Sequence, residues 1–265
     1  MKVTIHRKDF SNFLRCLDLL VDKCNDVQIH AGVIRQRSNF KESIFEMDLS
    51  PLITDTDIIM SNFKQKLPML KQLSQQGEVV IISTDDNLSF VGKRSKFKFD
   101  NPRIDFLDNK FVPDEEFRNL FTLAEDSLIV EYPFEKDTCQ LMKVTSKQFS
   151  IVSFQMLFQG NEASIIASTL SKEQYCKIEA GIPVKKPVQG YSNIVTTPFL
   201  IDHDGEILLR MFNTRDDIFT NKLSTTVGKV NVNVYGRSQL INEDEKEECF
   251  NPAKEVINQD VTEKE

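Results

Sequence analysis

The sequence predicts an α+β protein of two similar domains, each with antiparallel sheets that carry helices packed on one face. A length of 265 residues suits two domains of roughly 100–150 residues each. In the first hundred residues, two amphipathic helical segments alternate with strand-like runs. The same order of strand, helix and strands begins again near Leu141. The two halves therefore share an order of elements and not a repeated sequence.

The first helical segment follows a short strand at residues 3–5. It is expected at residues 10–23, with Asp9 as the cap of its N-terminus. One face is apolar at a period near 3.6 residues and holds Phe10, Phe13, Leu14, Leu17, Leu20 and Val21. The opposite face is polar and holds Lys8, Asn12, Arg15, Asp22 and Lys23. Strands are expected to follow at residues 27–30, 33–37, 43–49 and 58–60.

The second helical segment is expected at residues 61–75, with Ser61 or Asn62 as its cap. Its apolar positions are Phe63, Leu67, Leu70 and Leu73, and Lys64 and Lys71 lie on the opposite arc. Pro68 should shorten or kink the helix unless it falls in the first turn. A strand at residues 78–84, a turn at 85–87 and an apolar-basic alternating strand at 88–102 complete the first half.

The middle of the chain predicts an ordered connector, because it holds more aromatic residues than a disordered linker would. A short helix is expected at residues 114–123 and a strand at 127–134. The second half should then hold a strand at 141–144, a helix at 147–158 capped by Thr145 or Ser146, and a short helix at 215–223. Further strands are expected at residues 164–169, 175–182, 192–199, 207–212 and 229–235.

These boundaries divide the chain into four parts. Residues 1–102 form the first domain, residues 103–138 the connector, and residues 139–240 the second domain. Residues 241–265 form an acidic tail that should be flexible, because nine carboxylates and three lysines give it a net charge of −6. Most of the total charge of −7 therefore lies in the tail. A nearly neutral body does not exclude nucleic acid, because patches matter more than totals.

Chemistry-bearing motifs are sparse, so no reaction is assigned and no cofactor is expected. No phosphate-binding GxxxxGKS loop occurs. The three histidines are far apart, and Asp202-His203-Asp204-Gly205 lacks the later acidic ligands of a calcium loop, so we interpret it as a polar turn and expect no metal. The five scattered cysteines indicate reduced, buried thiols. Neither a signal-peptide pattern nor a run of about 18 apolar residues is present, which favours a cytoplasmic protein without a membrane partner.

The polar helix faces are the features that predict a function. Helix faces that line a channel around duplex DNA need cationic and amide side chains that contact phosphates. They do not need side chains that recognise individual bases. The candidate DNA-binding residues are Lys8, Asn12, Arg15, Lys23, Lys64, Lys71, Lys147 and Gln148. The alternative for each of them is a helix face that is merely solvated.

Residues 1–102 resemble the first domain of a DNA polymerase sliding clamp of the phage-type, proliferating-cell-nuclear-antigen-like class. The matching segments are the helices at 9–23 and 61–75, the strand at 78–84 and the closing segment at 87–102. The run Lys143-Val-Thr-Ser-Lys-Gln-Phe149 resembles the strand-to-helix opening of the second clamp domain. The likeness covers most of residues 1–240 and lies in element order, because clamps have no catalytic signature.

This resemblance implies a non-enzymatic processivity factor for DNA replication. Its subunits would close head to tail as a homotrimer, a ring with helices inside and sheets outside. The ring would encircle double-stranded DNA without sequence preference, tether a DNA polymerase and be placed by a clamp loader. Client peptides would dock beside the connector, where the candidates are Ile104, Phe106, Leu107 and Phe111. If the protein is viral or from a phage, its place is the host cytoplasm. The alternative is a non-enzymatic α+β assembly protein, for example a virion component, that does not encircle DNA.

Overall fold

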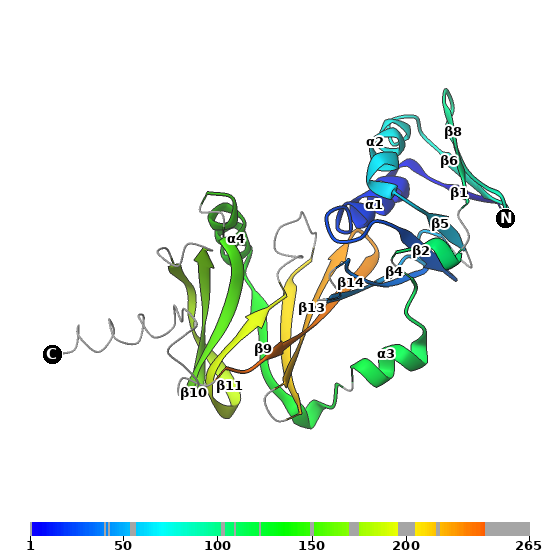
Figure 1. Cartoon of the computed structure of the whole chain (residues 1–265). Helices are drawn as coiled ribbons and strands as arrows, with labels where there is room; N and C mark the ends of the chain where they lie inside the picture. Colours follow the sequence, from blue (N-terminus) through cyan, green and yellow to red (C-terminus); the bar gives the residue numbers. More distant parts are fainter. Residues whose placement is uncertain are drawn as a thin grey trace. The chain divides into compact units, whose positions relative to one another are not determined.

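A computed structural model describes residues 2–39, 41, 43–53, 57–101, 104–108, 110–121, 123–148, 151–169, 175–195, 205–215 and 218–241. The chain divides into two units (Figure 1). Unit 1 comprises Met1–Leu120, Ile201–Gly205 and Ser224–Val234, and unit 2 comprises Phe121–Leu200, Glu206–Leu223 and Tyr235–Glu265. The expected boundary after residue 102 lies inside unit 1.

Unit 1 contains two antiparallel sheets. The four-stranded sheet has the order β1-β6-β7-β8, from β1 (Lys2–Ile5), β6 (Val79–Ser83), β7 (Asn87–Val91) and β8 (Lys96–Asp100). The other runs β5-β2-β3-β4, from β2 (Val27–His30), β3 (Val33–Arg37), β4 (Ser43–Asp48) and β5 (Ile58–Met60), and continues into β14 (Val230–Gln239). The helices are α1 (Arg7–Asp18), α2 (Phe63–Leu73) and α3 (Asp114–Leu120), with a short 3-10 helix at Ile104–Phe106.

Helix α1 forms because its apolar positions repeat at helical spacing and reach the four-stranded sheet. Phe10, Phe13 and Leu17 are completely buried, and the ring of Phe10 lies 6.4 Å from that of Phe90 on β7. The expected N-terminal cap is wrong: His6 holds the N-cap position and Asp9 lies in the first turn. A carboxylate there still faces the positive end of the helix dipole. The helix ends at Asp18, five residues before the expected end at Lys23.

Helix α2 buries Phe63, Leu67, Leu70 and Leu73, as the sequence predicts. The helix does not end at Pro68 but continues to Leu73, and it is shorter than the expected 61–75 at both ends; a kink at Pro68 stays a prediction. The side chain of Pro68 is exposed. Because proline has no backbone N–H, it leaves one hydrogen bond of the helix unmade. Neither Ser61 nor Asn62 caps the helix through a side chain; Asn62 occupies the N-cap position in a left-handed conformation.

The segment expected as one strand at residues 88–102 is instead a hairpin of β7 and β8. A turn separates them, closed by a hydrogen bond from the Gly92 amide to the Ser95 carbonyl at 2.8 Å. The Gln76 side chain holds this turn, since it accepts from the Arg94 amide and donates to the Ser95 hydroxyl. The missed turn has a physical reason: Gly92 and the basic residues after it form a short polar break that alternation alone does not reveal.

Unit 2 is built around one long antiparallel hairpin. Its elements are a 3-10 helix (Glu125–Ser127), β9 (Leu128–Phe134), α4 (Lys136–Gln148), β10 (Ile151–Thr169), β11 (Tyr175–Ile194) and β12 (Ile207–Arg215), with parts of β13 (Ile218–Val227) and β14 (Val230–Gln239). Strand β10 pairs with β11, and β9 pairs with β12. The core includes Phe134, Met142, Phe154, Phe158 and Phe219.

Three expectations for the second half are wrong. The expected strand at residues 141–144 lies in α4, and the expected helix at 147–158 ends at Gln148 and is replaced by β10. Buried Cys139, Met142 and Thr145 are spaced by three, whereas Phe154, Met156 and Phe158 are spaced by two, so the period changes just after residue 148. The expected helix at 215–223 is mostly strand β13, whose buried residues alternate toward Val227.

The other strands expected in the second half fall on observed strands, in part or whole. Residues 164–169 and 175–182 lie in β10 and β11, residues 207–212 lie in β12, and residues 230–235 lie in β14. The expected strand at 192–199 is described only to residue 195, and the turn with Asp202 and His203 lies outside the described residues. The expected strand at 127–134 and the helix starting at Asp114 are confirmed as β9 and α3.

A buried carboxylate, Asp26, should contribute to the stability of unit 1 by accepting two backbone hydrogen bonds. Its two oxygens accept the amides of Asn62, at 3.0 Å, and Asp108, at 2.6 Å, and it is only 5% exposed. In Asp26→Asn, one oxygen becomes an NH2 donor that faces a backbone donor, so the free energy of unfolding should fall by about 1–3 kcal/mol. Urea unfolding measures this, with Asp85→Asn in an exposed turn as the control. Equal midpoints for both variants would contradict the assignment.

Candidate nucleic-acid interface

The basic residues expected at DNA lie on or beside two neighbouring helices of unit 1. Because α1 and α2 turn their apolar faces inward, their polar faces remain in solvent. Lys8 is exposed in the first turn of α1, Arg15 is half-buried, and Lys23 lies in the turns that follow the helix. Lys64 and Lys71 are exposed on α2. The two helices pack against each other (Figure 1), so these cations belong to one helix layer.

Asn12 does not belong to this exposed face, which corrects the expectation. Its side chain is 6% exposed and packs against the backbone of Gly228. A Cβ at Gly228 would lie only 2.1 Å from the Asn12 amide nitrogen. Arg15 donates to the Asn12 oxygen at 3.4 Å. Asn12 is therefore a packing residue at the edge of the polar face. Its side chain fits there because residue 228 is a glycine, whose missing Cβ leaves room for the Asn12 amide.

The residues proposed for DNA in the second half lie in the last turn of α4. Lys147 is exposed there, and the side chain of Gln148 lies outside the described residues. Whether Lys147 meets DNA stays a prediction.

The helix layer also carries acids that sequence reasoning did not count as partners. Lys64 forms an ion pair with Asp22 at 2.7 Å, and Lys71 forms one with Asp18 at 2.7 Å. Each pair joins α2 to α1 or to the turns after it. The sequence showed Asp22 on the polar face, but no periodic signal reveals which lysine of another element it meets.

The connector divides into exposed and anchored residues. Ile104 is 49% exposed and Phe106 is 74% exposed. Leu107 is buried at 4%, and Phe111 packs edge-on against His30, with ring centroids 5.3 Å apart. Of the four expected partner contacts, Leu107 is therefore a core residue, because its side chain turns into unit 1. Phe111 is half-buried, and Ile104 and Phe106 present apolar surface to solvent.

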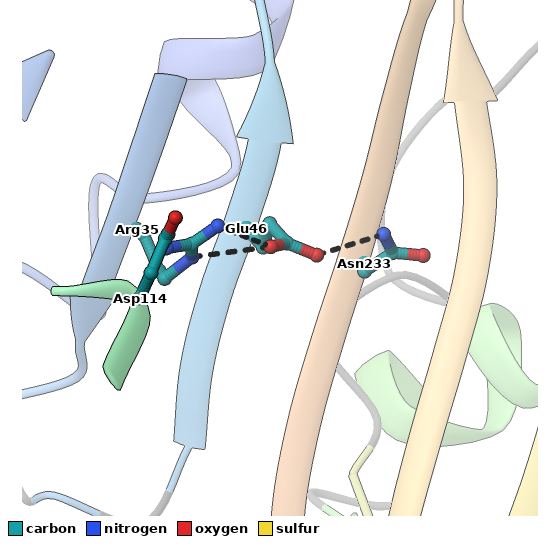
Figure 2. Close-up of polar contacts among 4 residues, drawn as sticks. All are labelled: Arg35, Glu46, Asp114 and Asn233. Carbon is teal, nitrogen blue, oxygen red and sulfur yellow. Dashed lines mark hydrogen bonds and ion pairs between the residues drawn. The ribbon is translucent and has the colours of Figure 1, made fainter. Parts of the chain in front are cut away.

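Two arginines of β3 hold the start of α3, and Figure 2 shows the contacts of one of them, Arg35. Arg35 forms an ion pair with Asp114 and donates to Glu46 at 3.0 and 3.1 Å. The other oxygen of Glu46 accepts from Asn233 on β14 at 3.2 Å. Arg37 pairs with Glu116 at 2.5 Å, and the guanidinium of Arg35 lies 4.7 Å from the ring centre of Phe117. We call these contacts to Asp114 and Glu116 the connector clasp.

The clasp shifts the protonation of both partners. Burial lowers the pKa of Arg35, but its bonds to Asp114 and Glu46 raise it more, so the pKa lies above its ordinary value. The hydrogen bond from Arg35 lowers the pKa of Asp114. Both groups are therefore charged at neutral pH, and the contact persists below the ordinary carboxylate range.

The described residues offer little chemistry beyond charge and shape. Among them, no three His, Cys, Asp or Glu side chains gather as a group that could hold a metal ion. Burial raises the pKa of Cys24 to about 12 and that of Cys139 to about 11, so both stay protonated thiols at neutral pH. None of the helices in the described part of the chain is long and apolar enough to cross a membrane.

Comparisons with known proteins identify the fold. No protein-family model and no curated protein matches the sequence. Among solved structures, the PCNA2–PCNA3 complex of Sulfolobus tokodaii has a TM-score of 0.58 at 12% identity, over 90% of this chain and 99% of that chain. A. fulgidus PCNA, solved with the C-terminal region of FEN-1 bound, has a TM-score of 0.53 at 11% identity, over 91% and 99%. The DNA polymerase III beta subunit of Thermotoga maritima has a TM-score of 0.57 at 14% identity, over 97% of this chain and 67% of that chain.

The chain therefore has the fold of a sliding clamp, and the predicted α+β fold class and clamp resemblance are confirmed. It matches nearly the whole length of the PCNA chains and about two thirds of the longer bacterial subunit.

The connector clasp generates a prediction about acid. Because Arg35 lowers the pKa of Asp114, the attraction is fully present above the ordinary carboxylate pKa and is lost as pH falls through the lowered value. Asp114→Asn should reproduce the acid effect at neutral pH, with faster amide hydrogen exchange in α3. Glu115→Gln, an exposed neighbour on the same helix, is the control. Equal exchange rates in the two variants would show that the ion pair does not hold α3.

Proposed function

We propose that this chain is a sliding clamp that encircles duplex DNA and tethers a replicative DNA polymerase. The observation that carries the proposal is an exposed, mainly basic layer on α1 and α2 of a clamp fold. The lysines and arginines of this layer suit phosphates and offer no arrangement for reading bases. A ring held on DNA by its topology needs only weak phosphate contacts, and weak contacts permit sliding. The chain is proposed to act without catalysis of its own, in the cytoplasm, of the host if it is viral or from a phage.

Self-assembly into a ring follows from the same proposal. Strand β8 has β7 as its neighbour and is an edge of the four-stranded sheet. An edge strand exposes unpaired amides and carbonyls, which favour pairing with another chain. A head-to-tail contact between identical copies closes as a ring when its rotation permits. We propose three copies, which a clamp loader opens and places on DNA.

The exposed part of the connector is the proposed contact for client proteins. Ile104 and Phe106 offer apolar surface on a short helical turn, and the clasp keeps the following segment in place. The bound C-terminal region of FEN-1 in the A. fulgidus structure supports a clamp surface that accepts a peptide. Leu107 is proposed to support this surface from beneath.

Reversing charge on α2 tests the DNA assignment. Lys64→Glu with Lys71→Glu should leave the fold intact, because both side chains are exposed. The affinity for a linear duplex should fall most at low salt, and the slope of log K against log salt should decrease by about 2. Polymerase processivity on primed circular DNA with a loader should fall as well. Lys41→Glu with Lys110→Glu, two exposed residues that lie outside these helices, has the same charge change and should retain the slope. Equal slopes in the two variants would contradict the assignment.

The oligomeric state is a separate test. Multi-angle light scattering at micromolar concentration should give a mass near three times the 30.5 kDa of the chain. A stable 30.5 kDa monomer would overturn the closed ring, and a large open assembly would favour a virion-type structural protein.

A further inference from the structure

We infer that Asp18 and Asp22 are built-in counter-ions that compete with DNA phosphates for Lys71 and Lys64, and so limit how tightly the helix layer holds DNA. This inference rests on the proposed function, because it concerns the same helix layer. The two acids would weaken DNA binding, whereas the lysines that they contact would strengthen it.

The geometry places each carboxylate directly on a proposed phosphate ligand. The oxygen of Asp22 lies 2.7 Å from the Lys64 ammonium, and the oxygen of Asp18 lies 2.7 Å from the Lys71 ammonium. A lysine ammonium is a compact point charge, so its attraction is shared between any anions that reach it. A phosphate that approaches Lys64 or Lys71 must therefore displace the carboxylate or accept its repulsion.

Both ion pairs are exposed, so a DNA phosphate can replace the carboxylate beside each lysine. The side chains of Lys64 and Asp22 are 63% and 79% exposed, and those of Lys71 and Asp18 are 51% and 36% exposed. Exposed ion pairs are weak, since water and salt screen them. DNA can thus displace the carboxylates, but each contact gains less than it would from an unpaired lysine.

The acids of this part of the chain follow one pattern. Residues 7–23 contain three carboxylates, and each forms an ion pair with a lysine of another element. The third is Asp9, whose oxygen lies 3.5 Å from the Lys229 ammonium. The pattern reduces positive charge where lysines of neighbouring elements approach α1. A uniformly basic layer would bind phosphates more strongly and would slow sliding.

A purely structural role for the two pairs is the competing explanation. The two helices already pack against each other, and each buries an apolar face, which includes Leu17 on α1 and Leu70 on α2, 0% and 1% exposed. Exposed pairs add little to such a contact. A structural role predicts a change in thermal stability without a change in the salt dependence of DNA binding, so the two explanations separate by experiment.

The test is Asp18→Asn with Asp22→Asn in the full chain, measured by fluorescence anisotropy with a linear 30-base-pair duplex, roughly 100 Å long, over a series of KCl concentrations. Removing two weak competitors should tighten binding about fivefold at low salt, and should steepen the salt dependence. Asp85→Asn with Asp86→Asn, in the exposed turn before β7, makes the same change in net charge at another surface. Asp22→Asn alone, which lies outside α1, provides a second variant should the double change impair folding.

The outcomes separate this inference from the proposed function. Tighter binding by the Asp18 and Asp22 variant than by its control supports the inference. Equal binding by these two variants, while Lys64→Glu with Lys71→Glu weakens binding, overturns the inference and leaves the proposed function standing. If neither the acid variants nor the lysine variants alter DNA binding, the proposed role of the helix layer at DNA is wrong, and this inference is wrong as well.

Discussion

The burial of the phenylalanine-rich face of α1 against the four-stranded sheet is the constraint on which the rest of unit 1 depends. Phe10 and Phe13 are completely buried and stack with ring centroids 6.0 Å apart. Once this face is inward, the polar face of α1 must point to solvent. Helix α2 packs beside it, which brings Lys64 and Lys71 to the same layer. The candidate DNA surface is thus a consequence of core packing, and it needs no specialised loop.

Charge in unit 1 serves two different purposes. On the helix layer, weak and exposed ion pairs leave cations that anions in solution can reach. On β3, Arg35 is only 14% exposed and is held by Asp114, Glu46 and aromatic rings, so that guanidinium is committed to anchoring the connector. The difference in burial separates basic residues that are accessible to the proposed DNA contact from a basic residue that anchors the connector.

The sequence predicted the elements whose hydrophobic period is strong and local. Helices α1 and α2 and most strands of the first half fall where periodicity placed them, although α1 begins and ends earlier than expected. A strand was expected at residues 141–144 because β-branched Val144 favours a strand locally, whereas buried Cys139 and Met142 pack at helical spacing in α4.

For the candidate site, periodicity predicted that Lys8, Lys64 and Lys71 would be exposed, and the structure places them so. It could not predict the burial of Asn12 against Gly228, or the carboxylate partners of the lysines. Those contacts join elements distant in sequence.

The measurement that tests the central claim most directly is photo-crosslinking from Gln72, an exposed α2 residue, to a linear duplex whose ends are either free or blocked. The account predicts strong labelling with free ends, weak labelling with blocked ends, and little from a crosslinker at Glu115. Equal labelling from Gln72 and Glu115, or equal labelling of duplexes with free and with blocked ends, would contradict encirclement of DNA by this helix layer.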